Sequence, residues 1–187
     1  MDADLPEGGE NRKLNRLVAM TVVVLSVFMG VSHIKDDNLV QAMQLAKADS
    51  VDRWSEYQAT RTKLHIVETA RAEAALIAGA HPSPAAAQAI AKFDAEIVKY
   101  RAEGPRIQAQ ARGLEAKYDA LNTHDDQFDM SDALISIAIS LAAVASLAET
   151  RWLLVAAWVI GGFGLVMGVA GFAGWALHPD ALASFLS

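Results

Sequence analysis

Three long stretches of this chain contain no charged residue, and they limit what the chain can fold into. They cover residues 17–32, 133–148 and 152–177. Most of the charge lies between the first two stretches, where residues 35–132 hold 12 of the 16 lysines and arginines and 16 of the 22 aspartates and glutamates. A helix crosses the hydrocarbon core of a membrane with about 20 mostly apolar residues. The pattern therefore predicts an integral membrane protein with one segment exposed to water.

The predicted membrane spans are three helices, over residues 14–34, 132–149 and 152–177. The first span has a competing interpretation as a cleavable signal peptide, since Arg12, Lys13 and Arg16 resemble a positive leading region. No cleavage site of the A-x-A kind follows it, which favours an uncleaved anchor. Only residues 149–151 separate the last two charge-free stretches, so we expect a tight helical hairpin there.

Four glycines in the third span share one helical stripe, because they are spaced by three, four and three residues: Gly161, Gly164, Gly168 and Gly171. A stripe without side chains allows another helix backbone to approach closely. We expect it to pack against a helix of the same chain or of another subunit. The second span offers a face of small residues at Ala138, Ala142 and Ser146. The alternative is that the glycine stripe lines a pore.

The segment between the first two spans, residues 35–131, is predicted to be helical. Helix-forming residues dominate it, and runs of β-branched residues are absent. Its strongest break, at residues 79–84, combines a glycine with two prolines and divides the segment into helices at about 37–78 and 84–122. We expect these two arms, each about 60 Å long at 1.5 Å per residue, to form an antiparallel hairpin projecting from the membrane.

The second arm carries a coiled-coil pattern. Its apolar or small residues alternate spacings of four and three at Ala86, Ile90, Phe93, Ile97, Tyr100, Gly104, Ile107, Ala111, Leu114, Tyr118 and Leu121. Because the pattern keeps its phase across Pro105, we predict a kinked but continuous helix there. The first arm is less regular, with a polar gap at 58–63 between its apolar positions: Val40, Met43, Val51, Trp54, Tyr57, Leu64, Val67, Ala74 and Ile77.

Self-association is the expected use of this hairpin. One pair of helices with a single apolar seam buries little surface, so we expect hairpins from several copies to pack side by side around an axis. Trp54 and Tyr57 lie three residues apart, a spacing that favours a place in the seam over a binding site.

Aspartates gather where the hairpin meets the membrane. Asp36 and Asp37 follow the first span, and Asp125, Asp129 and Asp132, which share a helical face, precede the second. Hard divalent cations prefer several oxygen ligands, so the last three aspartates are candidate metal ligands or, in an oligomer, an acidic collar above a pore. The alternative is that they cap helix ends and solvate the chain where it leaves the lipid.

Several kinds of chemistry find no support in the sequence. The chain has no cysteine, which removes disulfides, cysteine-ligated metals and thiol nucleophiles. Its net charge of −6 argues against a nucleic-acid partner. The five histidines are far apart, and neither a Ser–His–Asp arrangement nor a phosphate-binding loop stands out. We therefore expect no enzymatic activity and no cofactor.

The two ends are predicted to be tails, a disordered acidic one at residues 1–13 and a short one at residues 178–187. Four basic residues flank the spans on the N-terminal side and three on the hairpin side. By the positive-inside rule this favours a cytoplasmic N-terminus and a periplasmic hairpin.

Two long segments resemble an uncharacterised family of bacterial membrane proteins classed as a domain of unknown function. They are SHIKDDNLVQAMQLAKADSVDRWSEYQATRTKLH, after the first span, and HDDQFDMSDALISIAISLAAVASLAETRWL, leading into the last two. The likeness runs from about Asn15 to Gly174, and IKD-N-VQAM, VD-W--YQA and HD--FD carry it. It implies an inner-membrane location and the same order of span, hairpin and two spans, but no activity.

The leading hypothesis is a non-enzymatic integral membrane protein that self-associates as a scaffold or accessory subunit. Its expected partners are membrane lipid and further copies of itself. The alternative is a homo-oligomeric ion channel or transport component, with the aspartates as its vestibule and Ser136, Ser140 or the glycine stripe along the path. A membrane enzyme ranks third, because no nucleophile, base and metal set is clustered.

Overall fold

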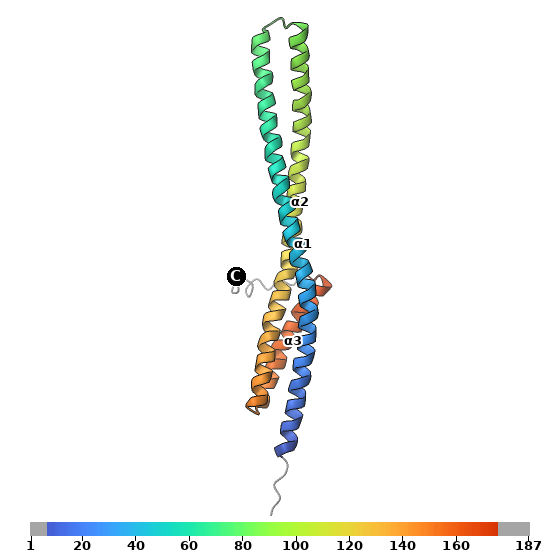
Figure 1. Cartoon of the computed structure of the whole chain (residues 1–187), viewed down its shortest axis with the longest axis vertical. Helices are drawn as coiled ribbons and strands as arrows, with labels where there is room; N and C mark the ends of the chain where they lie inside the picture. The colour runs from blue at the N-terminus through green and yellow to red at the C-terminus, as the bar shows by residue number, and fades with distance from the viewer. Residues whose placement is uncertain (1–6, 176–187) are drawn as a thin grey trace, which may run out of the picture. The chain divides into compact units, whose positions relative to one another are not determined.

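The structure is a computed structural model that describes residues 7–175 of the chain and the side chains of residues 11–175. Across this range the chain forms three α-helices and no strand: α1 (Glu7–Ala78), α2 (Pro84–Leu147) and α3 (Arg151–Ala173) (Figure 1). Each helix contains a stretch long and apolar enough to cross a membrane. The all-α fold predicted from the sequence, with three long apolar helices, is confirmed.

The first two helices are longer than any helix predicted from the sequence. α1 joins the predicted first span to the predicted first arm without a break, and α2 does the same for the second arm and second span. Helix also replaces part of the predicted disordered tail at residues 1–13, since residues 7–13 are the first turns of α1.

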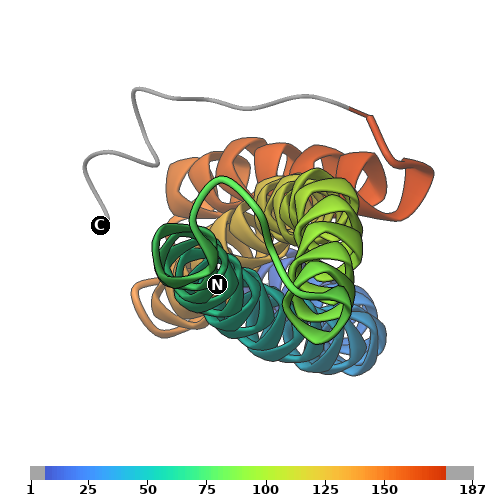
Figure 2. The same cartoon turned by 90° about the horizontal axis from the view of Figure 1, so that it is seen from above.

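The chain divides into two compact units. Unit 1 comprises residues 1–42 and 120–187, and unit 2 comprises residues 43–119. In its described part, unit 1 contains the beginning of α1, the end of α2 and all of α3. Unit 2 contains the remaining parts of α1 and α2 as an antiparallel hairpin, whose turn is seen from above in Figure 2.

The turn of the hairpin lies at the predicted helix break, residues 79–84. α1 ends at Ala78, and Gly79 adopts a φ of 63°, a left-handed conformation that glycine reaches without steric cost. Ser83 then caps α2, because its hydroxyl oxygen accepts a hydrogen bond from the Ala86 N–H (3.2 Å). Pro84 occupies the first helical position, where the N–H that proline lacks has no helical partner.

The seam of unit 2 is the one predicted on the second arm. All eleven positions of the coiled-coil pattern are buried or half-buried, and α2 continues through Pro105. Along the middle of the hairpin the two arms meet in a small apolar cluster formed by Leu64, Val67, Ile97, Phe93 and Tyr100. Farther from the turn, the Trp54 indole Nε1 donates a hydrogen bond to Glu115 Oε1 (2.8 Å).

The first arm departs from its predicted apolar positions. Val51 and Ile77 are exposed, and the polar residues Ser50 and Thr60 are buried. Thr60 lies inside the stretch at 58–63 that looked like a polar gap. Short hydroxyl side chains can occupy a helix seam when the partner helix is close, so hydropathy alone misplaced these positions.

The core of unit 1 lies between its three helical segments, and α3 lies beside the other two (Figure 1). Its buried residues are Leu14, Val18 and Leu25 of α1, Ile135, Ala138, Ala142 and Ala145 of α2, and Leu154 and Ala157 of α3. Hydrogen bonds also link the segments. Among them, Ser146 Oγ donates to Asn15 Oδ1 (2.7 Å), and Trp158 Nε1 donates to Thr21 Oγ1 (2.8 Å).

Both ends of α3 differ slightly from the predicted third span at 152–177. The connection from α2 turns at Glu149, which has a φ of 52°, and α3 starts at Arg151. α3 ends at Ala173, because Gly174 adopts a left-handed conformation with a φ of 67°. The tail predicted at residues 178–187 and the first six residues of the chain lie outside the described residues.

Candidate functional site

The glycine stripe of α3 lies against the other helices of the same chain. All four glycines are buried. A methyl group added at Gly161 would lie 3.1 Å from the Ala138 Cβ, and one added at Gly164 would lie 2.9 Å from the Ile135 Cγ1. These distances are shorter than ordinary van der Waals contact, so the glycines allow α3 to approach α2 this closely.

The second half of the stripe holds aromatic side chains. A methyl group at Gly168 would lie 2.6 Å from the Phe28 ring, and one at Gly171 would lie 2.9 Å from the Phe128 ring. Both rings pack edge-to-face on Phe172, with centroids 6.2 Å and 5.1 Å away. The stripe is therefore occupied within one chain, which leaves it unavailable to line a path between subunits.

The aspartates near the membrane boundary are the second candidate site, and the structure distributes them among different partners. The carboxyl groups of Asp36 on α1 and Asp125 on α2 lie close to one another, and each affects the pKa of the other. An ionised carboxylate only accepts hydrogen bonds, so a hydrogen bond between the two groups forms only when one of them carries a proton. The Oδ1 atom of Asp36 is buried without a hydrogen-bond partner.

The surroundings of this pair favour that proton. Burial, followed by the neighbouring charge of Asp36, raises the pKa of Asp125 from 3.8 to about 6. Burial and the charge of Asp129 also raise the pKa of Asp36. The two aspartates therefore form a carboxyl pair that joins α1 to α2 most tightly when it is protonated.

The three aspartates predicted as metal ligands do not share one partner. Asp125 pairs with Asp36, Asp132 lies 2.9 Å from His33 (Oδ1 to Nε2), and Asp129 is exposed. Among residues 7–175, no group of three or more histidine, aspartate or glutamate side chains is arranged to hold a metal ion. The geometry therefore gives the metal hypothesis no support.

Gln127 is a site residue that the sequence did not reveal. Its side chain is fully buried, and its Nε2 donates a hydrogen bond to the Trp175 carbonyl oxygen (2.8 Å), just after the end of α3. Its Oε1 lies 3.1 Å from His124 Nδ1. Gln127 thus satisfies a carbonyl group at the end of α3, where helices leave such groups without partners. No periodicity distinguishes it within a polar stretch of sequence.

The chain matches the family described as Domain of unknown function (DUF4337) over residues 14–174. It belongs to the DUF4337 family. The match covers α1 from Leu14 onward, all of α2 and α3, and the Gly174 cap. It confirms the predicted resemblance to a domain of unknown function, over nearly the predicted range. No curated protein and no solved structure matches the chain. In this DUF4337 protein the matched region includes the glycine interface, the Asp36–Asp125 pair and the whole hairpin of unit 2.

Proposed function

We propose that this DUF4337 protein is a non-enzymatic integral protein of the bacterial inner membrane that self-associates as a scaffold or accessory subunit. Its N-terminus would face the cytoplasm, and unit 2 would carry the contact between copies. The observation on which the proposal depends is a row of large apolar side chains exposed on unit 2, outside the predicted spans.

The core of unit 2 is small for its length. Ten of its 77 residues are buried, and one of these is a glycine and two are hydroxyl residues. The ion pairs that join its two arms, Arg71 with Asp94 (2.9 Å) and Arg101 with Glu68 (2.7 Å), involve exposed or half-buried side chains and add little stability. A scaffold of this size with one thin seam needs further burial, and oligomerisation is one of the usual sources.

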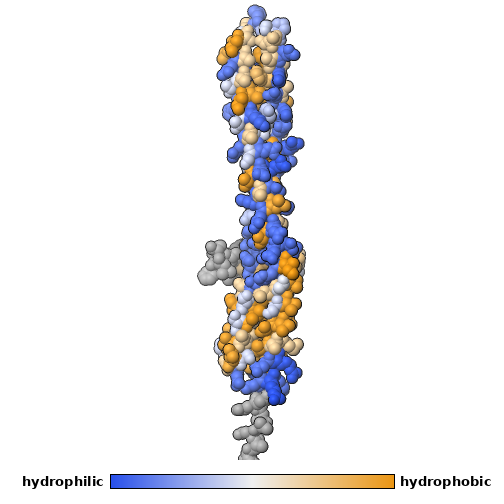
Figure 3. Space-filling model, viewed as in Figure 1, coloured by the Kyte–Doolittle hydropathy of each residue, from blue (hydrophilic) through white to orange (hydrophobic). Residues whose placement is uncertain are grey.

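The outer surface of unit 2 offers that further burial. Leu76 and Ile77 are 83% and 88% exposed, and four further large apolar residues are more than half exposed: Leu45, Val51, Ile66 and Val98. Figure 3 shows hydrophobic patches among the hydrophilic residues on the visible face of unit 2. At 3.6 residues per turn, Leu45, Ile66 and Ile77 share one face of α1, turned away from the seam residue Leu64.

A second copy of the chain is the partner that this surface favours. Membrane anchoring gives all copies a common orientation and confines them to two dimensions, which raises their effective concentration. The same apolar residues can then meet in a symmetric interface, where each copy contributes an identical patch. Water surrounds unit 2, so burying these side chains stabilises the assembly by the hydrophobic effect.

Single cysteines test the proposal cleanly, because the chain has none of its own. Ile66→Cys and Ile77→Cys variants, treated in membranes with a flexible bifunctional maleimide, should give a product of twice the chain's mass. Arg61→Cys is the matched control, since Arg61 is exposed on α1 but turned away from the apolar face. Equal cross-linking of the control, or none at either isoleucine position, would contradict the proposal.

A further inference from the structure

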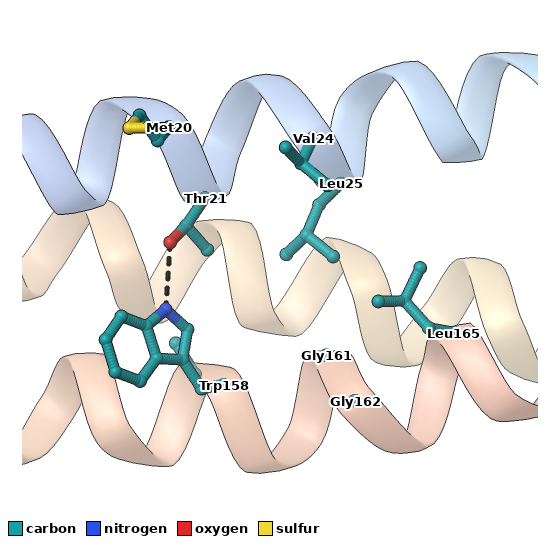
Figure 4. A pocket seen from close by; sticks show the side chains of 9 residues that line it. Met20, Thr21, Val24, Leu25, Trp158, Gly161, Gly162 and Leu165 are labelled. Carbon is teal, nitrogen blue, oxygen red and sulfur yellow. Dashed lines mark hydrogen bonds between the residues drawn. The ribbon is translucent and has the colours of Figure 1, made fainter.

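Two hollows lie next to one another between α1 and α3 of unit 1. The first, of about 320 Å³, has apolar walls at Val24, Leu25 and Leu165 and a floor at Gly161 and Gly162 (Figure 4). The second, of about 420 Å³, lies toward the beginning of both helices, with Leu14, Leu17, Leu154 and Val155 in its walls. Trp158 lines both hollows, and its hydrogen bond to Thr21 bridges the two helices where the hollows meet. The two hollows together are called here the α1–α3 groove.

The α1–α3 groove has a basic end. Lys13 of α1 and Arg151 of α3 line the second hollow, just outside the predicted spans. Beyond them the lining is apolar, apart from the Thr21 hydroxyl and the Trp158 indole N–H, which are hydrogen-bonded to one another (2.8 Å, Figure 4). A groove with positive charge at the membrane surface and apolar walls below it matches a molecule with an anionic head and a hydrocarbon chain.

The length of the groove fits one leaflet of a membrane. From Lys13 to Leu25, α1 rises about 18 Å at 1.5 Å per residue. Half of a hydrocarbon core about 30 Å thick is about 15 Å. A lipid whose phosphate contacts the basic end therefore has room to lay one acyl chain past Trp158 and over Gly162, at which an added methyl group meets nothing within 4 Å.

We propose that the α1–α3 groove binds one anionic phospholipid, with its phosphate held by Lys13 and Arg151 and one acyl chain lying along Trp158 and Gly162. The proposal depends on the chain spanning a membrane and not on self-association, so either proposal can fail alone. On the proposed orientation the basic end lies in the cytoplasmic leaflet, where anionic lipids give the membrane a negative surface.

The test is native mass spectrometry of the full chain in detergent with equal amounts of phosphatidylglycerol and phosphatidylcholine of identical acyl chains. The wild type should retain phosphatidylglycerol preferentially. The variant Lys13→Gln/Arg151→Gln should lose about 30-fold of this preference, at about a factor of five for each basic side chain near an anionic head group. Lys35→Gln/Lys63→Gln, which removes two charges elsewhere, should keep it.

A second variant tests the apolar part of the groove independently. Gly162→Leu fills the space over the floor and should lower the retention of both lipids, whereas the control Gly30→Leu should not. Gly30 lies in the predicted span of α1, outside the groove, and its surroundings are as open as those of Gly162. Circular dichroism of each variant without lipid should match the wild type.

Three results would overturn the lipid site. They are equal retention of the two lipids by the wild type, unchanged retention in Gly162→Leu, and displacement of the lipid by free glycerol phosphate. The last would show that the basic end binds phosphate without a hydrocarbon chain.

Discussion

Replacing Gly164 with alanine tests the closest approach of α3 to α2. The added methyl group would lie 2.9 Å from Ile135 Cγ1, 3.1 Å from Leu134 Cβ and 3.1 Å from the Ser131 carbonyl oxygen. The last is a backbone atom and cannot rotate away as the end of a side chain can. The substitution therefore forces the two helices apart instead of shifting one side chain.

The expected cost follows from two opposing effects. Inserting an extra carbon into a well-packed core costs about 1–3 kcal/mol. Alanine favours helix over glycine by about 1 kcal/mol, which offsets part of this cost. We expect Gly164→Ala to lower the free energy of unfolding by about 0–2 kcal/mol. In a chain of this size that corresponds to a fall in Tm of up to roughly 8 °C.

Gly162→Ala is the matched control, because a methyl group at Gly162 meets nothing within 4 Å. It should leave Tm unchanged or raise it slightly through helix propensity. Thermal unfolding of both variants in the same detergent, followed by circular dichroism, compares them directly. If Gly164→Ala unfolds at the same temperature as Gly162→Ala, the inferred packing of α3 on α2 is refuted.

Three further predictions test other parts of the fold. The pKa of Asp125 is raised to about 6 by burial and Asp36, so the folded chain holds this proton more tightly than the unfolded chain. The resulting stabilisation is complete below about pH 4 and is lost as the pH rises through about 6. After screening by solvent it amounts to about 1 kcal/mol in the free energy of unfolding. Thermal unfolding measured across this pH range should show the dependence in the wild type and not in Asp125→Asn. Pro105→Ala should restore a helical hydrogen bond in α2 and raise the free energy of unfolding by up to about 3 kcal/mol. A denaturation experiment in which this free energy does not increase would contradict the prediction. Trp54→Phe should cost about 1 kcal/mol by removing the donor to Glu115, more than Glu115→Gln, which keeps an acceptor.

The sequence was informative about the fold where one periodicity governed a long segment. The pattern on the second arm predicted the buried side of α2 at every position, because seam residues recur at a fixed spacing whatever their partner. It was less informative on the first arm, where Thr60 is buried and Ile77 is exposed. Hydropathy describes one residue at a time, whereas burial also depends on the partner helix and on partners outside the chain.

The candidate sites are formed by contacts between residues of different helices, and the sequence of one helix does not show which residues of another helix it contacts. The spacing of the glycines predicted a close approach of helices, but it did not indicate which helices approach. Pairing Asp36 with Asp125 requires the register of α1 against α2, which is set by packing along both helices. The α1–α3 groove likewise arises where Trp158 of α3 meets Thr21 of α1, and the sequence separates these two residues by more than a hundred positions.

The mass of the complex extracted in mild detergent shows directly whether copies of the chain associate. Size-exclusion chromatography with light scattering, corrected for bound detergent, measures the mass of the protein alone. We expect a mass of at least two copies of the 20.0 kDa chain, maintained on dilution. A mass of one chain at every protein concentration, from membranes in which the chain is abundant, would contradict self-association.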